Sequence, residues 1–401
     1  NRGITIGAGN GTFSGTSSGT ISSAVTGVGG LTKALSGALT LGGNNDFAGG
    51  LTVLGGTVHL NHDNAAGTGS ITITPASAAT IRNSVAATNV ANDIVLNIGG
   101  GSVIDFFATT GNTLALNGVI SGAANWNRGS GGGGGSVVLG GSSANTFSGN
   151  LTIATGGLIV AKDGALGTVA GTTTVSSGSL GFIGGVSYTN AEPVSINSAA
   201  VLANPSGNNS FPGPITLTGS VGSSTQINVA AGRLTLSGVI TSGPGLGITK
   251  SGPGTLVLTN ANTYTDPTTV SGGTLLANNT TGSATGPALL AVNAGGALGG
   301  TGAVGGGEVD VVTTADRGMP GHHEHVVVGQ VVGGRRAVKE LHVTGIYAPR
   351  PAGCALGDTG SPTVGPWPSW TLATPASRPP PHATASAAAS AASPTRWPAR
   401  P

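Results

Sequence analysis

The sequence predicts an all-β fold wound as a parallel β-solenoid, and three observations support this prediction. In residues 246–277, short runs have an apolar residue at every second position: Leu256 and Leu258 share one side of an extended segment, while Val257 points to the other. Gly, Asn or Pro closes each run after a few residues, which is typical of short strands and tight turns. The same pattern returns at residues 31–60 and, in a looser form, from residue 126.

The three copies also share their internal spacing. The interval from Lys33 to Phe47 equals the interval from Lys250 to Tyr264, and a pair of glycines follows each aromatic residue at a matching distance. The middle copy has Arg128 in the lysine position and a glycine run at 131–135 before the apolar alternation resumes. Matching offsets in three copies indicate a repeat protein.

Strand-like runs follow one another at short intervals through residues 1–307, and no window long enough for a helix has a helical period. In chain order, the predicted strands lie within Ile4–Ile6, Leu31–Leu41, Leu51–Leu60, Ile71–Ile73, Ile94–Ile98, Val103–Phe107, Leu114–Ile120, Val137–Leu139, Leu151–Val160, Thr172–Val175, Val194–Ile196, Ile215–Leu217, Ile227–Val229, Leu234–Ile240 and onward to Leu298.

A β-sandwich array and a β-propeller are the alternatives to a solenoid. Sandwich cores are usually rich in aromatic residues, which make up 3% of this chain. A propeller would repeat a blade signature every 40–50 residues or so, and none occurs. In a solenoid, small side chains stack above like side chains of the next coil, and Gly and Asn suit recurrent corners with positive φ. We therefore expect coils of about 20–25 residues.

Composition limits the function. Charged residues make up 7% of the chain, against about 25% in typical domains, and the formal charge is +2, so a nucleic-acid partner is not expected. Disorder is an alternative to a folded chain because Gly numbers 75 of 401 residues, but 38% apolar content in regular alternation favours a packed core.

The sequence contains no run of about 18 apolar residues, so it predicts no membrane helix. The chain begins Asn1-Arg2, so we expect any secretion signal to lie outside it.

The character of the sequence changes near Gly307, which predicts two regions. Charged residues number 14 in the first 307 positions and 14 in the last 94, and proline rises from 9 to 13. We therefore expect a β-helical repeat region at 1–307 and an irregular Pro- and Ala-rich tail at 308–401. The leading hypothesis for the tail is a shifted reading frame or gene-prediction artefact, and the alternative is a disordered tail.

The stretch 246–277 resembles the autotransporter-associated β-strand repeat of passenger regions in type V secretion, which is a Gram-negative system. The matching elements are Ile248-Thr249-Lys250, Gly252-Pro253-Gly254-Thr255-Leu256-Val257-Leu258, Asn262-Thr263-Tyr264-Thr265, Thr268-Thr269-Val270 and Gly272-Gly273-Thr274-Leu275. Asp266-Pro267 replaces the usual glycine turn. The resemblance implies a right-handed parallel β-helix that is displayed on the cell surface at the outer membrane, or released outside the cell. It also implies a membrane link only through a translocator barrel, which we expect to be absent from this chain.

Two motifs in the tail resemble chemical sites but lack their partners. Asp358-Thr359-Gly360-Ser361 resembles an aspartic-protease loop, yet it occurs once, without flanking apolar strands. The segment 322–325 (His-His-Glu-His) does not have the i, i+4 helical spacing of a zinc protease. We interpret both as coincidence.

The candidate residues in the repeat region also lack the pattern of a chemical site. His59, His62 and Asp63 are interpreted as a solvated turn, and the glycine run 129–135 is not followed by the Lys-Ser/Thr of a phosphate loop. The cations at the shared repeat position are interpreted as solvated gatekeepers at a coil edge: Lys33, Arg128 and Lys250.

The sequence therefore predicts no catalytic, cofactor-binding or metal-binding residue, no cofactor and no enzyme activity. We expect a surface-displayed or secreted stalk or adhesin-type passenger fragment, with a host or cell-surface receptor or a glycan as partner. The alternatives are a β-helix polysaccharide lyase or hydrolase, which needs clustered acids, and a truncated remnant without activity. The acids are scattered in sequence, at Asp46, Asp63, Asp93, Asp105, Asp163, Glu192 and Asp266.

Overall fold

The computed structural model describes residues 3–97, 103–130, 132 and 134–305, together with the backbone of three later strands. Every regular element in these residues is a β-strand, and the strands pair side by side in parallel along most of the chain. The predicted all-β parallel solenoid is therefore confirmed. In the part of the chain that is described, no helix is long and apolar enough to cross a membrane.

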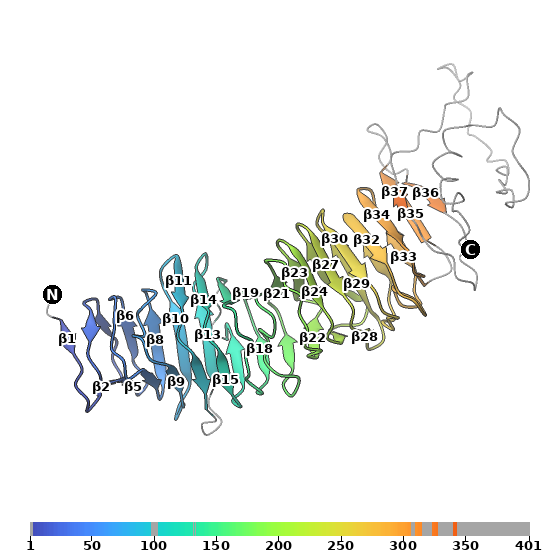
Figure 1. Cartoon of the computed structure of the whole chain (residues 1–401). Helices are drawn as coiled ribbons and strands as arrows, with labels where there is room; N and C mark the ends of the chain where they lie inside the picture. Colours follow the sequence, from blue (N-terminus) through green and yellow to red (C-terminus); the bar gives the residue numbers. More distant parts are fainter. Residues whose placement is uncertain are drawn as a thin grey trace, which may run out of the picture.

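Four long sheets run along the solenoid, and a short pair of β1 (Ile4–Thr5) and β4 (Val25–Thr26) lies at its N-terminal end (Figure 1). Sheet 1 has six strands: β2 (Gly11–Ser14), β5 (Leu31–Ala34), β7 (Leu51–Val53), β9 (Ile71–Ile73), β12 (Ile94–Leu96) and β15 (Ile120–Gly122). Sheet 2 has eleven: β3 (Gly19–Ile21), β6 (Ala38–Leu41), β8 (Gly56–Leu60), β10 (Ala79–Asn83), β13 (Ile104–Ala108), β16 (Trp126–Arg128), β18 (Leu151–Ile153), β20 (Thr173–Val175), β22 (Val194–Asn197), β25 (Ile215–Thr218) and β28 (Ile240–Ser242).

The other two sheets extend into the second half of the chain. Sheet 3 has twelve strands: β11 (Ala87–Val90), β14 (Thr113–Leu116), β17 (Ser136–Leu139), β19 (Gly157–Val160), β21 (Ser179–Phe182), β23 (Val201–Asn204), β26 (Ser223–Val229), β29 (Leu246–Ser251), β31 (Thr268–Val270), β33 (Leu290–Val292), β35 (Val309–Thr314) and β36 (His323–Val327). Sheet 4 has six: β24 (Asn208–Phe211), β27 (Arg233–Leu236), β30 (Thr255–Leu258), β32 (Gly273–Ala277), β34 (Gly296–Gly300) and β37 (Glu340–His342).

The path of the chain moves onto a new sheet as the solenoid proceeds. Early coils alternate between sheets 1 and 2, and the coils from β9 to β17 visit sheets 1, 2 and 3 in turn. Strands β18 to β21 use only sheets 2 and 3, the coils from β22 to β30 visit sheets 2, 3 and 4, and β31 to β34 use sheets 3 and 4. Successive repeat copies therefore start on successive sheets: Lys33 lies on sheet 1, Arg128 on sheet 2 and Lys250 on sheet 3.

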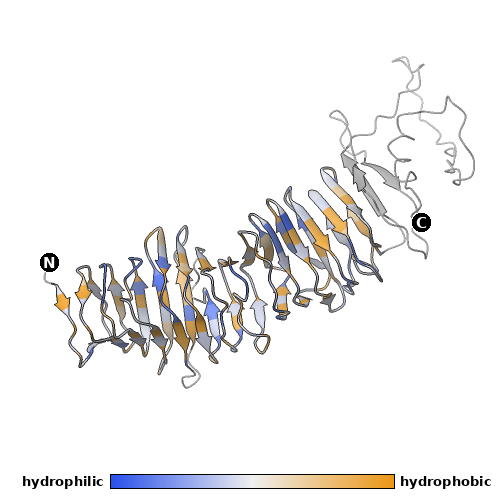
Figure 2. Cartoon of the chain, in the orientation of Figure 1, coloured by the Kyte–Doolittle hydropathy of each residue, from blue (hydrophilic) through white to orange (hydrophobic). Residues whose placement is uncertain are grey.

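The core consists of columns of apolar side chains along the axis. In sheet 1, register places Leu31, Leu51, Ile71, Ile94 and Ile120 next to one another, and all of them are buried. Within each strand, the residues that alternate with these buried ones face outward. Hydrophobic and hydrophilic residues therefore alternate along the strands (Figure 2). Neighbouring residues in a column are about 4.8 Å apart, so each buried side chain packs on a similar one in the coils above and below.

Figure 1 shows the stack as two straight stretches that meet at a bend. The blue and teal coils form one stretch, and the green to orange coils form the other. The bend coincides with the coils of β18 to β21, which have two strands each, and it precedes the first strand of sheet 4.

Parallel winding continues to β35, which pairs with β33, whereas β36 and β37 pair antiparallel to β35 and β34. The predicted boundary at residue 307 falls among residues 306–308, which lie outside the described part. The division into 1–307 and 308–401, and the irregular tail, therefore remain predictions.

Candidate functional site: buried polar groups of the repeats

The residues considered for chemistry do not come together. His59 Nδ1 lies 2.7 Å from Ser84 Oγ, whereas His62 Nδ1 accepts the Asn64 backbone N–H at 3.0 Å. Asp63 instead accepts from Asn89 N at 2.7 Å, so the three side chains have separate partners. Within the described residues, no group of three or more His, Cys, Asp or Glu side chains could hold a metal ion.

The tail motifs cannot be placed in this way. Asp358-Thr359-Gly360-Ser361 and His322 lie outside the described residues, and His323–Val327 is described only as the backbone of β36. Their interpretation as coincidence stays a prediction.

The lysine of the first repeat is buried, so the interpretation as a solvated gatekeeper is wrong. Alternation along β5 places Lys33 on the inner face with Leu31, and the whole residue is 0% exposed. Its Nζ donates to the carbonyls of Ala34 and Leu35 at 2.8 Å each, and to Gly55 of the next coil at 3.2 Å. The ammonium group thus closes a corner of its own coil and ties it to the following one. Burial lowers the pKa of Lys33.

Lys250 reproduces this arrangement in the last copy of the repeat. It is 0% exposed, and its Nζ donates to Ser251 O at 3.0 Å, Gly252 O at 2.8 Å and Gly272 O at 2.9 Å. The acceptors stand at the same three sequence offsets from the lysine as they do for Lys33. Desolvation lowers the pKa of Lys250 to about 8. We call these two contacts lysine clamps.

The middle copy makes a modified clamp with Arg128. This side chain is also 0% exposed, so the gatekeeper interpretation is wrong here too. Its Nε donates to Gly157 O of the next coil at 3.0 Å, and Nη2 donates to Gly135 O at the end of the glycine run. Burial lowers the pKa of Arg128 to about 10, and the nearby Asp105 carboxylate opposes that shift. Asp105 in turn accepts the backbone N–H of Gly129 at 2.8 Å and so fixes the start of the glycine run.

A second buried polar group accompanies each clamp. Three asparagines, each two positions before the aromatic residue of its repeat, are at most 5% exposed. Each amide accepts an N–H from the preceding coil and donates to a carbonyl of the following coil, at 2.6–2.9 Å. One side chain therefore links three coils. The asparagine clips are Asn45 (Val25 N, Ala65 O), Asn145 (Ile120 N, Ala165 O) and Asn262 (Ile240 N, Ala284 O).

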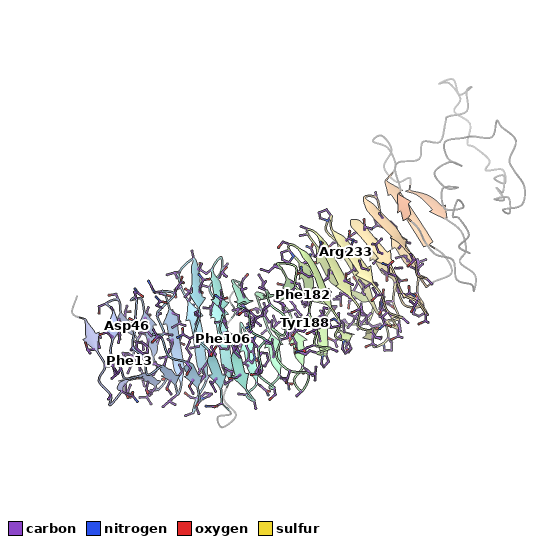
Figure 3. All side chains as sticks on the ribbon, viewed as in Figure 1. Phe13, Asp46, Phe106, Phe182, Tyr188 and Arg233 are labelled. Atoms are coloured by element: carbon purple, nitrogen blue, oxygen red, sulfur yellow. The ribbon has the colours of Figure 1, made fainter. Side chains whose placement is uncertain are left out.

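A buried carboxyl group lies in the bend, where no repeat motif predicts it. Glu192 is 1% exposed, Thr173 Oγ1 donates to its Oε1 at 2.8 Å, and Tyr188 Oη lies 3.4 Å from its Oε2. Burial raises the pKa of Glu192 to about 8, although both hydroxyl groups act in the opposite direction. Tyr188 Oη also accepts the Leu166 N–H at 2.9 Å, and burial raises the pKa of Tyr188 above its ordinary value. Figure 3 labels Tyr188 and Phe182 close to one another, and both rings pack on Phe211.

The signal for the clamps was present in the sequence. Lys33 comes two positions after Leu31, and Lys250 two after Ile248, so period-2 alternation puts each cation on the apolar side of its strand. The asparagine clips carry a weaker signal, because the interval from Lys33 to Asn45 equals that from Lys250 to Asn262. Glu192 had no signal, because it lies outside the repeats.

Two comparisons with known proteins found a match for this chain. The family model described as Passenger-associated-transport-repeat matches residues 31–60 and 248–277, the two segments that carry the lysine clamps. A segment of 169 residues is 33% identical to a protein of Brucella suis biovar 1 (strain 1330) named "Adhesin BmaC autotransporter". That match covers 41% of this chain and 4% of the relative, so the chain corresponds to a small part of the relative's length. No solved structure matches the chain.

Proposed function

Because the chain is an autotransporter passenger region with passenger-associated-transport repeats, we propose that it acts as a non-enzymatic rod that carries an adhesive surface. The observation that carries the proposal is that the buried polar groups form hydrogen bonds between coils. The lysine clamps and asparagine clips use their hydrogen bonds to link coils, which suits a stiff spacer. The named relative is an adhesin, and this supports the same role here.

We place this rod at the surface of a Gram-negative cell or outside it, in keeping with its repeats. The expected partner is a receptor or a glycan. A long polar surface suits the latter: outward positions of sheet 2 carry a column of hydroxyl groups, in register from coil to coil, formed by Thr152, Thr174, Ser195 and Thr216. Hydroxyl groups about 4.8 Å apart along a rigid face offer repeated hydrogen bonds to an extended polar polymer.

Binding of the purified full chain to a glycan array and to immobilised host-cell matrix tests the proposal. We expect saturable binding and no change in the length of any bound polysaccharide. A triple variant, Thr152→Ala, Thr174→Ala and Thr216→Ala, should bind less than the wild type. The matched control replaces by alanine three outward threonines that lie on three different sheets, and so form no column with one another: Thr52, Thr235 and Thr269.

Two results would contradict the proposed role. Release of shortened or unsaturated sugars that stops when one carboxylate is changed would favour a lyase or hydrolase. No binding to any surface, with the chain folded, would favour a remnant without activity of its own.

A further inference from the structure

The bend of the rod contains a segment with little regular structure. Residues 183–193 connect β21 to β22, and one isolated parallel bridge, between Ser187 and Ser210, pairs them with the following coil. Gly184 and Gly185 open the segment, and both have φ of +80°. A Cβ added at Gly184 would meet nothing within 4 Å, and one at Gly185 would meet a single atom at 3.9 Å. The two glycines are therefore open on the side where a side chain would point, whereas Gly207 of the following coil lies close to their backbone: a Cβ at Gly207 would be 2.6 Å from Gly185 N.

Side-chain contacts and separate backbone hydrogen bonds, and not a strand ladder, hold this segment to its neighbours. Toward the preceding coil, Tyr188 Oη accepts the Leu166 N–H, and Thr173 Oγ1 donates to Glu192. Toward the following coil, Tyr188 N donates to Ser210 O at 3.0 Å. Asp163 of the preceding coil also accepts the Thr189 N–H, and Asn190 Nδ2 donates to Gly167 O at 3.2 Å. The pair Tyr188–Glu192 is therefore the buried part of a wider attachment to the preceding coil.

In the described coils, the partners of Glu192 are hydroxyl groups and not cations. From β20 it meets Thr173, and from its own segment it meets Tyr188. The remaining charged group acts through Tyr188: it is Asp163, which accepts the Thr189 N–H at 2.8 Å and is also an acid. The following coil presents an uncharged group, with Asn209 Oδ1 accepting the Val186 N–H at 2.7 Å. An ionised Glu192 would therefore be a buried negative charge without a positive partner among these groups, which is costly.

We propose that residues 183–193 form a hinge between the two straight stretches of the rod, and that ionisation of Glu192 opens it. While the carboxyl group keeps its proton, the segment stays docked through Tyr188 and Thr173. When the proton is lost, the carboxylate regains water only if the segment swings outward, and the two glycines supply the backbone freedom. This device does not depend on the role as an adhesive rod.

The direction of the pH effect follows from the folded-state pKa of about 8 and the ordinary value of 4.5. A group whose pKa is raised in the closed state stabilises that state fully below pH 4.5, and the contribution is lost as the pH rises to 8. The opening equilibrium should increase about tenfold per pH unit between pH 5 and 8 and level off above that.

Hydrogen exchange by mass spectrometry on the full chain tests the hinge. The wild type and Glu192→Gln, which mimics the protonated form, are compared at equal pH, so that the intrinsic pH dependence of exchange cancels. For peptides covering 183–193, the ratio of wild-type to variant exchange should rise about 50-fold from pH 6 to pH 8. Peptides around Tyr264 serve as an internal control, because its hydroxyl pairs with Thr268 Oγ1 at 2.6 Å and no glutamate takes part in that contact. Their ratio should stay at about one.

Two further measurements keep the test decisive. Small-angle scattering should show a wider range of rod shapes at pH 9 than at pH 6 for the wild type, and no such change for Glu192→Gln. Tyr188→Phe removes the phenol but keeps the acid, so its segment should exchange faster at every pH with the wild-type slope. A pH-independent ratio for 183–193, or a slope that vanishes in Tyr188→Phe, would overturn the proposal. If Glu192→Gln does not fold, the slope of Tyr188→Phe against the Tyr264 peptides decides alone.

Discussion

Replacing Lys250 tests the energetics of the lysine clamp most directly. Lys250→Met keeps much of the buried stem and removes the ammonium group. The change leaves three buried carbonyls without that donor, at about 1–3 kcal/mol each. It also removes the burial cost of the charge, for which the lowering of the pKa from 10.5 to about 8 implies about 2 kcal/mol after allowing for screening. The difference is a net loss of about 1–7 kcal/mol in the free energy of unfolding, and we expect a value near the lower end, about 2 kcal/mol, because each carbonyl oxygen keeps a second lone pair for another partner.

Lys250→Ala separates the stem from the charge. It removes the same hydrogen bonds and most of the methylene groups, and it leaves a cavity beside Ile227 and Val270, the neighbours of Lys250 in register. We expect a loss of about 5 kcal/mol, of which about 3 kcal/mol is added by the lost burial and the cavity. Lys250→Arg should lose least, because Arg128 fills the same position in the middle repeat.

Urea unfolding of the full chain at pH 7, followed by circular dichroism, measures all three variants. The order of midpoints should be wild type, then Arg, Met and Ala, with similar slopes against urea concentration. The control is Thr269→Ala, at an outward position of β31, and it should stay within about 0.5 kcal/mol of wild type. If Lys250→Met matches the wild type and Lys250→Ala loses less than about 1 kcal/mol, the clamp does not stabilise the coil pair.

Three further outcomes follow from the same contacts. Asn262→Ala removes the hydrogen bonds with Ile240 N and Ala284 O, so it should lower the free energy of unfolding, measured in urea, by about 2–4 kcal/mol. A loss below about 1 kcal/mol would mean that other groups can take over the hydrogen bonds of this asparagine clip. Because the folded-state pKa of Lys250 lies below its unfolded value, the wild type should gain about 1–2 kcal/mol between pH 8 and 10.5, and Lys250→Met should lack this gain in urea titrations across that range. Leu35 is 52% exposed with φ of +61°, so Leu35→Asn should raise the melting temperature slightly, and a decrease would show that the leucine side chain contributes more than its strain costs.

The fold could be predicted because the chain repeats itself at two levels. Alternation within strands gives the inner and outer faces, as in Leu31-Thr32-Lys33, and the matching offsets of the copies give the winding. The change of sheets along the chain could not be predicted in the same way. It depends on whether a coil makes two or three strands, and the residues that decide this, such as those of β11 and β24, have weak apolar alternation.

The cations of the repeats were identified in the sequence, but they were expected in solvent and lie in the core. Charged side chains are rarely fully buried, so the composition rule favoured solvent for Lys33 and Lys250. The period-2 rule favoured the core, and it was right, because the corner carbonyls provide three acceptors for each ammonium group. The buried site of Glu192 could not be predicted for a different reason: its partners Thr173 and Tyr188 come together only when the coils stack.

The step from one sheet to the next has a consequence for how the molecule meets other surfaces. The copies that begin at Leu31, Trp126 and Ile248 start on three different sheets, so equivalent outward side chains point in different directions around the axis. A ligand that recognised one copy would find the equivalent surface of the next copy on a different face of the rod, rotated about the axis. Attachment would then be insensitive to how the rod is rotated on its base.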